Sequence, residues 1–449
     1  MNVRRLASRW LVVLGAAFGF GRMPAPAQLS AAEPTNTVVL TSQVGLSPSY
    51  GSVIALKDGS LLWTWGRGGK AAGPIFGTRS RDGGRTWSDP APLPLEDGRP
   101  LHGLFTTSLV RLRSGALGQA LIAAPREVRF FRSRDEGRTW SAGVKVHADN
   151  ERVAFTNDRA LVLSTGRIVL PVYSSLEGPR LPVRKPRVAQ FGAEFETVAA
   201  GLAYSFTLYS DDEGATWRRS DNEVFVALDQ GYGGLFAAEE PAVAELTDGR
   251  LVMFVRTSLG RFYRSYSEDR GATWLAAEPT QLLGPPAPCS LTVLPGTGEL
   301  LAIWTQVSAF EVMEGLYRHR LSCAVSGDGG VTWRNFQNLE SLDDTNRIAD
   351  EVPRATLFGP GRQPVDRQRY VRAPGPLRAS YPTCTIVDGR ALVTYGLSTL
   401  GDRETITRTY GLDYDEVVRK LGFGPEARAN KVRSIPLEWF TQTRPAPQR

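Results

Sequence analysis

The chain has few of the residues that build metal sites and disulfide frameworks. Among its 449 residues it has only three histidines and three cysteines, Cys289, Cys323 and Cys384. The cysteines are odd in number and far apart, so they indicate neither a disulfide framework nor a metal cluster. The sequence also lacks a phosphate-binding loop, a dinucleotide fingerprint and a serine nucleophile elbow. We therefore expect no metal and no other cofactor.

The excess of positive charge is small. Lysine and arginine number 53 against 46 aspartates and glutamates, and four of the arginines lie in the first 27 residues, which carry no acid. The other 49 basic and 46 acidic residues leave a net charge of only +3, which is too weak to indicate a nucleic-acid-binding surface. Long apolar runs are also missing after residue 20, so we expect neither nucleic acid nor a membrane as a partner of the mature protein.

Residues 1–32 have the order of a secretory signal peptide. The basic stretch MNVRRLASRW precedes the apolar run LVVLGAAFGF, and small residues follow. The apolar run has about ten residues, which is too short to span a bilayer. Cleavage could follow Ala25-Pro26-Ala27 or Ser30-Ala31-Ala32, and an uncleaved anchor is the alternative. We expect a secreted or periplasmic protein.

One eight-residue motif, S-x-D-x-G-x-T-W, occurs five times without a broken position. Serine and aspartate suit a tight turn, glycine allows a positive φ, and tryptophan packs between strands. We therefore interpret the octet as structural rather than as a ligand site. The five copies begin at Ser80, Ser133, Ser210, Ser267 and Ser326.

A second motif, two apolar stretches around a turn glycine, alternates with the octet. Branched and aromatic residues on both sides of D-G, S-G or T-G predict two strands joined by a hairpin turn. A further apolar strand precedes each octet, so each unit has three or four antiparallel strands. The six hairpins span 53–65, 108–122, 160–173, 242–255, 291–304 and 384–396.

Six such sheets bury both faces if they stack radially, as in a β-propeller. We predict an all-β fold, a six-bladed propeller with four-stranded antiparallel blades, over residues 37–412. The end of the sixth unit, ETITRTYGLDY, could close the ring by pairing with TVVLTS at 37–42. We assign 413–449 to a C-terminal extension with a short helix in YDEVVRKL. A closed ring leaves few free strand edges, so we expect a monomer.

Two long insertions break the period of the array, at 174–203 and 334–380. Long loops on one rim of a scaffold usually frame its binding site. We therefore expect the site at the rim from which these insertions extend.

Five octets within a six-unit β array resemble the Asp-box sialidases, the BNR-repeat or neuraminidase superfamily, whose fold is a six-bladed propeller. The resemblance covers residues 40 to 410 approximately. It implies an exo-glycosidase that removes a terminal acidic sugar with a tyrosine nucleophile paired with a glutamate. A neutral phenol is not repelled by the substrate carboxylate. Three arginines grip that carboxylate, and an aspartic acid serves as acid and then as base.

The fourth hairpin matches two of these family positions. In EEPAVAELTDGRLVMFVR, Glu240 precedes the first strand and Arg256 ends the second. The resemblance implies that Glu240 is the partner of the nucleophile and that Arg256 binds the carboxylate. A solvated loop carboxylate, equivalent to its neighbour Glu239, is the alternative for Glu240.

The fifth and sixth units each match one further position. Arg318 lies eight residues before the fifth octet, where the family has a carboxylate-binding arginine, and Arg320 is the competing choice. Tyr381 stands at the start of the sixth hairpin, where the family has its nucleophile. The alternatives are a surface arginine and a tyrosine packed at a strand start. The four matching residues come from three units, and they would meet only in a ring.

Two family positions are not matched. Ser49-Tyr50-Gly51-Ser52 replaces the family's first arginine, and the loop WGRGGKAAGPIFGTRS lacks the acid/base aspartate. Arg67 in that loop could replace the arginine. His102 and Asp158, which precede the second and third hairpins, could supply the acid, and His102 has the better unperturbed pKa, about 6.5. A core-edge histidine and a turn-capping aspartate are the alternatives.

Three functions fit this pattern. The first is a secreted exo-glycosidase of the sialidase type that acts on sialic acid or a related acidic sugar. It predicts that Tyr381, Glu240, Arg256 and Arg318 converge in one axial pocket. The second is a carbohydrate-binding propeller that has lost catalysis. The third is a uronate polysaccharide lyase, in which Tyr381 or His102 removes a proton beside a carboxylate that arginine neutralises.

Overall fold

The computed structural model divides the chain into Met1–Ala32 and Glu33–Arg449. The expected signal peptide and Arg67 lie outside the described residues, as do 177–201 and 343–376 within the two insertions. The structure describes residues 35–40, 51–66, 71–124, 127–148, 153–176, 202–227, 235–257, 259–307, 318–342, 377–399, 402–409, 411–424 and 428–442.

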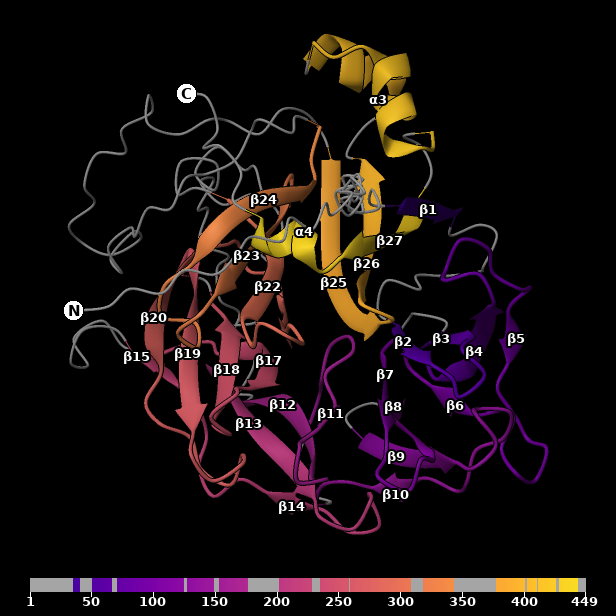
Figure 1. Ribbon diagram of the computed structural model, residues 1–449, viewed down its shortest axis with the longest axis vertical. Coiled ribbons are helices and arrows are strands. Elements are labelled where there is room, and N and C mark those ends of the chain that lie inside the picture. The colour runs from indigo at the N-terminus through magenta and orange to yellow at the C-terminus, as the bar shows by residue number, and fades with distance from the viewer. Residues whose placement is uncertain are drawn as a thin grey trace, which may run out of the picture. The chain divides into compact units, whose positions relative to one another are not determined.

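Six antiparallel sheets of the second unit follow one another around a ring and form a six-bladed β-propeller, as expected (Figure 1). We number the blades in chain order. The first three are β2 (Ser52–Ala55), β3 (Leu61–Gly66), β4 (Gly73–Ser80) and β5 (Ala91–Pro92), with β6 (His102–Gly103) beside β4; β7 (Thr107–Arg111), β8 (Leu117–Ala124), β9 (Glu127–Ser133) and β10 (Val144–Lys145); and β11 (Leu161–Val162), β12 (Ile168–Leu176), β13 (Leu202–Ser210) and β14 (Arg218–Arg219).

The other three blades have the same arrangement. All six expected hairpins form the first two strands of a blade, because each alternating stretch reverses at its turn glycine. Blades four to six are β17 (Glu239–Glu245), β18 (Leu251–Arg256), β19 (Arg261–Ser267) and β20 (Glu278–Leu283); β21 (Ser290–Val293), β22 (Leu300–Thr305), β23 (Leu321–Ser326) and β24 (Arg334–Glu340); and β25 (Leu377–Val387), β26 (Arg390–Thr399), β27 (Ala429–Pro436) and β1 (Thr35–Leu40). The remaining elements are the pair β15 (Val226–Ala227) and β16 (Leu235–Phe236), the π-helix η4 (Thr405–Thr409), and the helices α3 (Tyr414–Leu421) and α4 (Glu438–Thr441).

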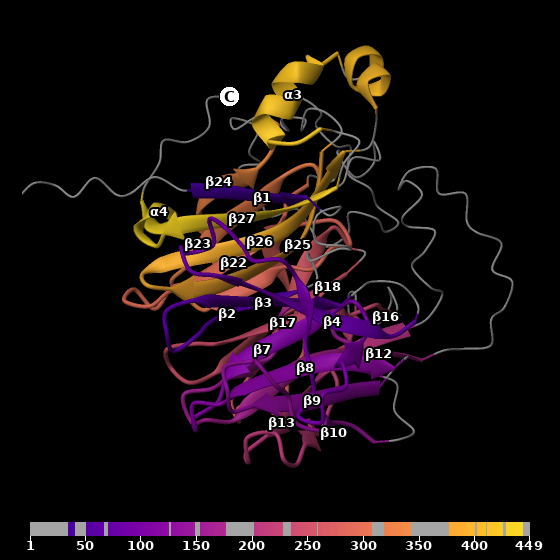
Figure 2. The same cartoon turned by 90° about the vertical axis from the view of Figure 1, so that its right-hand side faces the viewer.

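The sixth blade closes the ring with both ends of the second unit. β1 pairs with β27, Thr35 opposite Ser434, and β27 pairs with β26 (Figure 2). The sequence ETITRTYGLDY, which we expected to pair with the amino-terminal strand, instead contains η4 and begins α3. The propeller therefore extends beyond residue 412, where we expected it to end. The helix expected in YDEVVRKL is confirmed as α3.

The inner strands are joined by hydrogen bonds across blade boundaries. Each bond joins the inner strand of one blade, or the residues just before it, to the inner strand of the next blade. These bonds hold the inner strands close to the ring axis. These bonds link Ser52 to Leu109, Ser108 to Arg159, Thr156 to Glu240, Thr292 to Cys384, and Thr385 to Val53.

The five octets are tight turns, which confirms their structural interpretation. In every copy the serine hydroxyl bonds to the aspartate at 2.7–2.8 Å and accepts the glycine N–H at 2.8–2.9 Å. The threonine hydroxyl donates to the same aspartate at 2.6–2.7 Å. The octet glycines all have a positive φ, for example 89° at Gly84, which only glycine adopts without strain.

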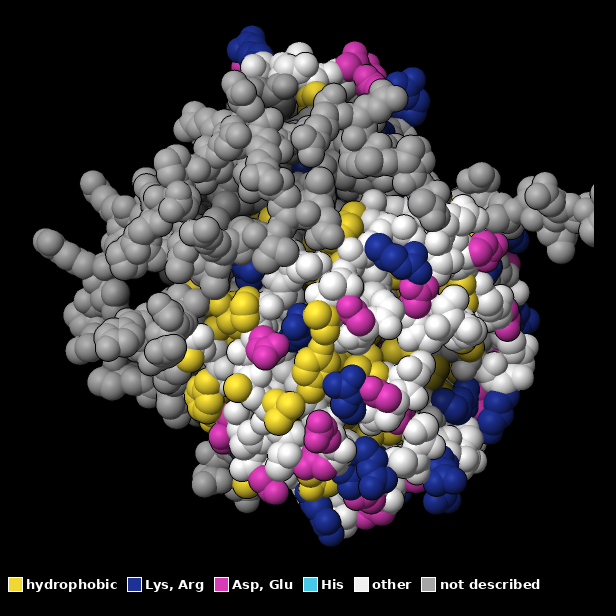
Figure 3. Space-filling model, turned by 60° about the vertical axis from the view of Figure 1, so that its left-hand side comes forward, with side chains coloured by type: hydrophobic (Ala, Val, Ile, Leu, Met, Phe, Trp, Pro, Cys, Tyr) yellow, Lys and Arg dark blue, Asp and Glu magenta, His cyan; other side chains and the backbone are white. Residues whose placement is uncertain are grey.

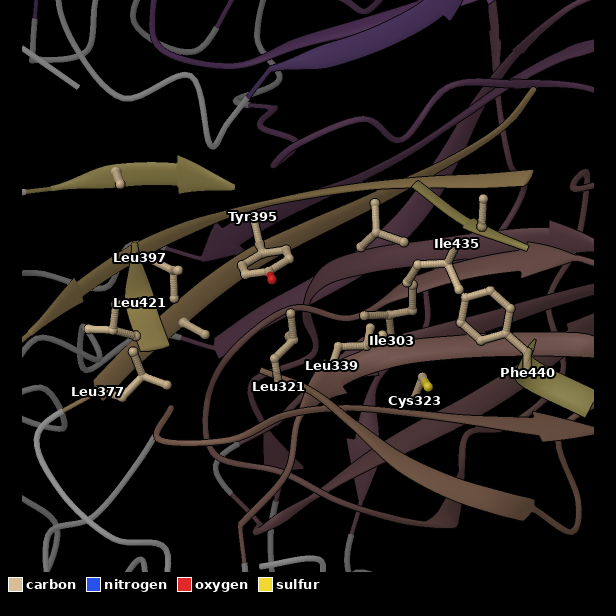
Figure 4. Close-up of a cluster of buried hydrophobic side chains, with 14 of the residues drawn as sticks. Ile303, Leu321, Cys323, Leu339, Leu377, Tyr395, Leu397, Leu421, Ile435 and Phe440 are labelled. Atoms are coloured by element: carbon tan, nitrogen blue, oxygen red, sulfur yellow. The ribbon is translucent and has the colours of Figure 1, made fainter. Parts of the chain in front are cut away.

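Apolar side chains fill the space between neighbouring blades. The cluster between the fifth and sixth blades includes Ile303, Leu321 and Tyr395 (Figure 4). Leu421 of α3 and Phe440 of α4 belong to the same buried cluster. The two helices therefore extend the propeller core, since burying such side chains contributes about 1.5–3 kcal/mol each.

The described surface mixes charges of both signs. Figure 3 shows basic and acidic side chains next to one another over the face that it displays, in keeping with the small net charge. Among the described residues, no helix combines the length and the apolar character needed to cross a bilayer.

Candidate active site

A β-bulge places Glu240 against Arg256. The pairing of β17 with β18 runs from Glu239 opposite Arg256 to Ala242 opposite Phe254, so one extra residue lies between these pairs. Glu240 occupies this bulge with φ 47°, and it is only 6% exposed. A bulge re-aims the side chain that it carries. Here Nη1 of Arg256 donates to Oε2 of Glu240 at 2.6 Å.

Glu239 belongs to the same charged cluster. Its Oε2 lies 3.9 Å from Nε of Arg256. Burial raises the pKa of Glu239, and the charge of Glu240 raises it further, against the opposing charge of Arg256. Burial alone would lower the pKa of Arg256, but the two carboxylates outweigh it and hold this pKa above its ordinary value. One guanidinium thus interacts favourably with two carboxyl groups.

Tyr381 lies against Arg318. The Cζ atom of Arg318 is 5.3 Å from the centroid of the Tyr381 ring, which is within the range of a cation–π contact. A bulge between Ser380 and Thr383 interrupts the pairing of β25 with β26 at Tyr381. Nη2 of Arg318 donates to the carbonyl of Pro286 at 3.0 Å. Arg318 therefore contacts the ring of the tyrosine.

Backbone strain is concentrated at these residues. Nine described residues other than glycine have a positive φ, and four of them are Asn157, Glu240, Arg318 and Tyr381. Such a conformation costs about 1–3 kcal/mol and persists where the surrounding structure imposes it, often at functional sites. The four residues come from the third, fourth, fifth and sixth blades, and each precedes or interrupts a strand.

Asp158 lies among the inner strands, as expected for its place before the third hairpin. Its Oδ1 accepts a hydrogen bond from the hydroxyl of Ser108 at 2.7 Å. Burial raises the pKa of Asp158 to about 6, although hydrogen bonds from Ser108 and Ser52 and the charge of Arg159 act in the opposite direction. This carboxyl group can therefore hold and release a proton near neutral pH.

Arg159 is a further residue of the cluster that we did not predict. Its Nε donates to the carbonyl of Thr156 and its Nη1 to the carbonyl of Cys289, both at 2.6 Å. Burial lowers the pKa of Arg159, and charge interactions with Cys289, Glu240, Asp158 and Tyr381 oppose this shift. Its guanidinium therefore lies within electrostatic reach of the candidate nucleophile and of two carboxyl groups.

Tyr173 on β12 is another neighbour that the sequence did not single out. Burial raises its pKa, and the negative charges of Glu240 and Glu239 raise it further, so the phenol stays neutral. A neutral hydroxyl beside these carboxylates can donate a hydrogen bond without adding charge.

The structure does not bring His102 to this cluster. His102 is exposed on β6 and lies opposite Pro74 of β4, whereas the inner strand of the second blade begins at Thr107. The expectation that His102 occupies the axial position before the second hairpin is therefore wrong. Arg67 lies outside the described residues. No group of three or more His, Cys, Asp or Glu side chains that could hold a metal ion occurs among the residues that the structure describes.

The ring and its turns define the chain as a sialidase-like six-bladed propeller. The family model of the BNR repeat-like domain matches residues 122–393, more than half of the sequence, and the chain belongs to this family. A sialidase from Micromonospora viridifaciens is 29% identical over 302 residues, which are 60% of this chain and 44% of that protein. The chain thus matches less than half the length of this relative.

Solved structures share the fold at low sequence identity. A protein of unknown function from Dyadobacter fermentans aligns with a TM-score of 0.51 and 18% identity, covering 89% of this chain and 98% of that chain. The NanB sialidase from Streptococcus pneumoniae aligns with a TM-score of 0.53 and 12% identity, covering 90% of this chain and 71% of that chain. At these identities the likeness shows the propeller fold.

Proposed function

We propose that this chain is an exo-glycosidase of the sialidase type that hydrolyses a terminal acidic sugar. The observation that carries the proposal is the convergence of four side chains from three blades. Arg256 and Glu240 form an ion pair at 2.6 Å, and Arg318 covers the ring of Tyr381. Charge interactions of Tyr381 and Glu240 with the same two arginines, Arg159 and Arg256, support the view that the two pairs belong to one cluster.

Substrate binding would use the guanidinium groups. Arg256 and Arg318 carry planar forks that match the two oxygens of a sugar carboxylate. Arg256 is already held by Glu240, so little side-chain freedom is lost when the substrate binds. The anionic sugar would place its anomeric carbon near the Tyr381 hydroxyl.

Hydrolysis would proceed in two displacements. The Tyr381 oxygen attacks the anomeric carbon, its proton passes to Glu240, and the bond from carbon to the leaving oxygen breaks. The leaving oxygen takes a proton from Asp158, the carboxyl group whose pKa is raised to about 6. Water then attacks the glycosylated tyrosine, gives a proton to Asp158, and the phenol recovers its proton from Glu240.

Turnover of two fluorogenic α-sialosides tests the nucleophile. One substrate carries an activated phenol as its leaving group, and the other carries an ordinary sugar. Tyr381→Phe should lower kcat/KM for both by about a hundredfold or more, because no atom can replace the attacking oxygen. Tyr263→Phe is the matched control, because it removes the hydroxyl of a buried tyrosine on β19 that has no hydrogen-bond partner among the described residues. Full activity of the Tyr381→Phe variant would overturn the assignment.

The same two substrates identify the proton donor. Asp158→Asn should lose turnover of the ordinary sialoside by about 10²–10⁴ but keep most of the turnover of the activated one, which needs little protonation. Glu239→Gln removes the other carboxyl group with a raised pKa in the cluster and should affect both substrates equally. The reverse pattern would assign the acid to Glu239. No turnover of any acidic glycoside by the wild type, with binding retained in calorimetry, would favour a carbohydrate-binding role.

A further inference from the structure

We propose that Arg159 is the buried cation that stabilises the negative charge developing on the Tyr381–Glu240 pair during the reaction. This inference rests on the proposed function, because it assigns the reacting groups to that pair. Arg159 is a positioning residue in this scheme, since it acts on the pair through its charge rather than by contact with the substrate.

The position of Arg159 is fixed by hydrogen bonds to residues of three blades. Its guanidinium donates to the carbonyl of Thr156, just before the third blade, and to that of Cys289, just before the fifth. Its backbone N–H donates to the hydroxyl of Ser108 in the second blade at 2.9 Å. Arg159 is only 5% exposed. The charge therefore has a set place at the centre of the ring and does not reorganise when a reaction charge appears.

The charge of Arg159 is incompletely compensated. Its Nη2 has no hydrogen-bond partner, and no ion pair among the described residues includes it. A buried cation without an ion-pair partner costs stability, so its retention points to a use for the charge. The neighbouring Asn157 is a second buried polar group here that is not satisfied. It is 0% exposed and has a φ of 61°, and neither atom of its side-chain amide has a partner among the described residues.

The groups that interact with the charge of Arg159 are the ones that react in the proposed mechanism. Arg159 interacts electrostatically with Glu240, Asp158 and Tyr381. As the phenol attacks, its oxygen passes through a partly anionic state, and a fixed cation in a water-poor site lowers the energy of that state. Among the described residues, charge interactions link Glu240 to Glu239 on β17, Arg256 on β18, Tyr173 on β12 and Arg159 before β11.

Replacement of the charge tests the proposal. Arg159→Met should lower kcat for the activated sialoside by about tenfold or more while KM changes by less than about threefold. The acidic limb of the kcat/KM profile should move to higher pH, because a nearby cation favours the charged form of a carboxylate that acts as the base. Arg159→Lys keeps the charge and should keep the acidic limb where the wild type has it.

Arg261→Met is the matched control. Arg261 is equally buried, its Nη1 donates to the carbonyl of Thr280, and its Nε and Nη2 lack partners. Among the described residues its charge interaction is with Tyr263, so its loss should cost stability and leave the pH profile unchanged. An Arg159→Met profile that matches the wild type would overturn the inference. If Arg159→Met does not fold, Arg159→Lys provides the test. This variant keeps the charge, so an acidic limb that differs from that of the wild type would overturn the inference. The proposed function fails separately, through an active Tyr381→Phe variant.

Discussion

The buried carboxyl group of Asp158 lowers the free energy of unfolding by an amount that depends on pH. Its pKa in the folded protein is about 6, against an ordinary value of 3.8, because burial disfavours the charged form. Between pH 3.8 and about pH 6, the carboxyl group of Asp158 is protonated in the folded protein but not in the unfolded chain. Stability therefore falls as pH rises from 4 to 6, by up to about 3 kcal/mol for this group. Asp158→Asn should remove this loss and be more stable than the wild type at pH 7.

The measurement is urea unfolding of both proteins at pH 4, 5, 6 and 7. The difference between the two free energies of unfolding should grow with pH and level off above pH 6. Asp97→Asn serves as the control, because Asp97 is exposed beside Arg99 and its pKa is lowered. A difference that stays constant from pH 4 to pH 7 would contradict the assignment of the titration to Asp158.

Several single residues of the site could be predicted because they fit a family pattern. Glu240, Arg256, Arg318 and Tyr381 stand at family positions, and the structure pairs Glu240 with Arg256 and Tyr381 with Arg318. Arg159 could not be found in this way. Its guanidinium bonds to the carbonyl of Cys289, which is 130 residues away, and nothing in the local sequence NDRALVL marks such a contact.

At the scale of elements, the third strand of the sixth blade carries a buried ion pair. Nζ of Lys431 on β27 lies 2.6 Å from Oε2 of Glu340 on β24, and the hydroxyl of Tyr395 donates to the same oxygen at 2.8 Å. Removing one partner leaves the other as an uncompensated buried charge. Lys431→Met should therefore destabilise the protein by about 3–5 kcal/mol in urea unfolding.

Removal of both charges provides the control. The double variant Lys431→Met with Glu340→Gln removes both charges of the pair, and the glutamine carbonyl can still accept the Tyr395 hydroxyl. Most of the lost stability should return. A double variant as unstable as the sum of its single changes would show that the pair does not act as one unit.

The element that sequence analysis missed is β27. Its residues, ANKVRSIP, lack the alternating apolar pattern and the turn glycine of the hairpins, so they do not predict a strand of the repeat. The strand forms because β26 and β1 flank it on both sides and satisfy its backbone groups. The six hairpins and five octets were predictable because each carries its own local pattern.

At the scale of the whole molecule, the propeller depends on the closure of its ring. Each blade buries one face against the blade before it and the other against the blade after it, so an open ring exposes two apolar faces. In the sixth blade β27 joins β26 to β1 through hydrogen bonds, and because all three cysteines are free no disulfide supports this junction.

Removal of residues 425–449 should therefore destabilise the whole propeller. It deletes β27 and α4, leaves β1 without its described partner, and uncovers the apolar cluster around Ile303 and Leu321. We expect loss of the single cooperative unfolding transition and rapid cleavage by protease at concentrations that spare the full chain. A chain that ends at residue 442 retains β27 and α4 and should behave like the full protein. If the shorter chain unfolded in one transition at the urea concentration of the full protein, closure through β27 would not be what holds the six blades together.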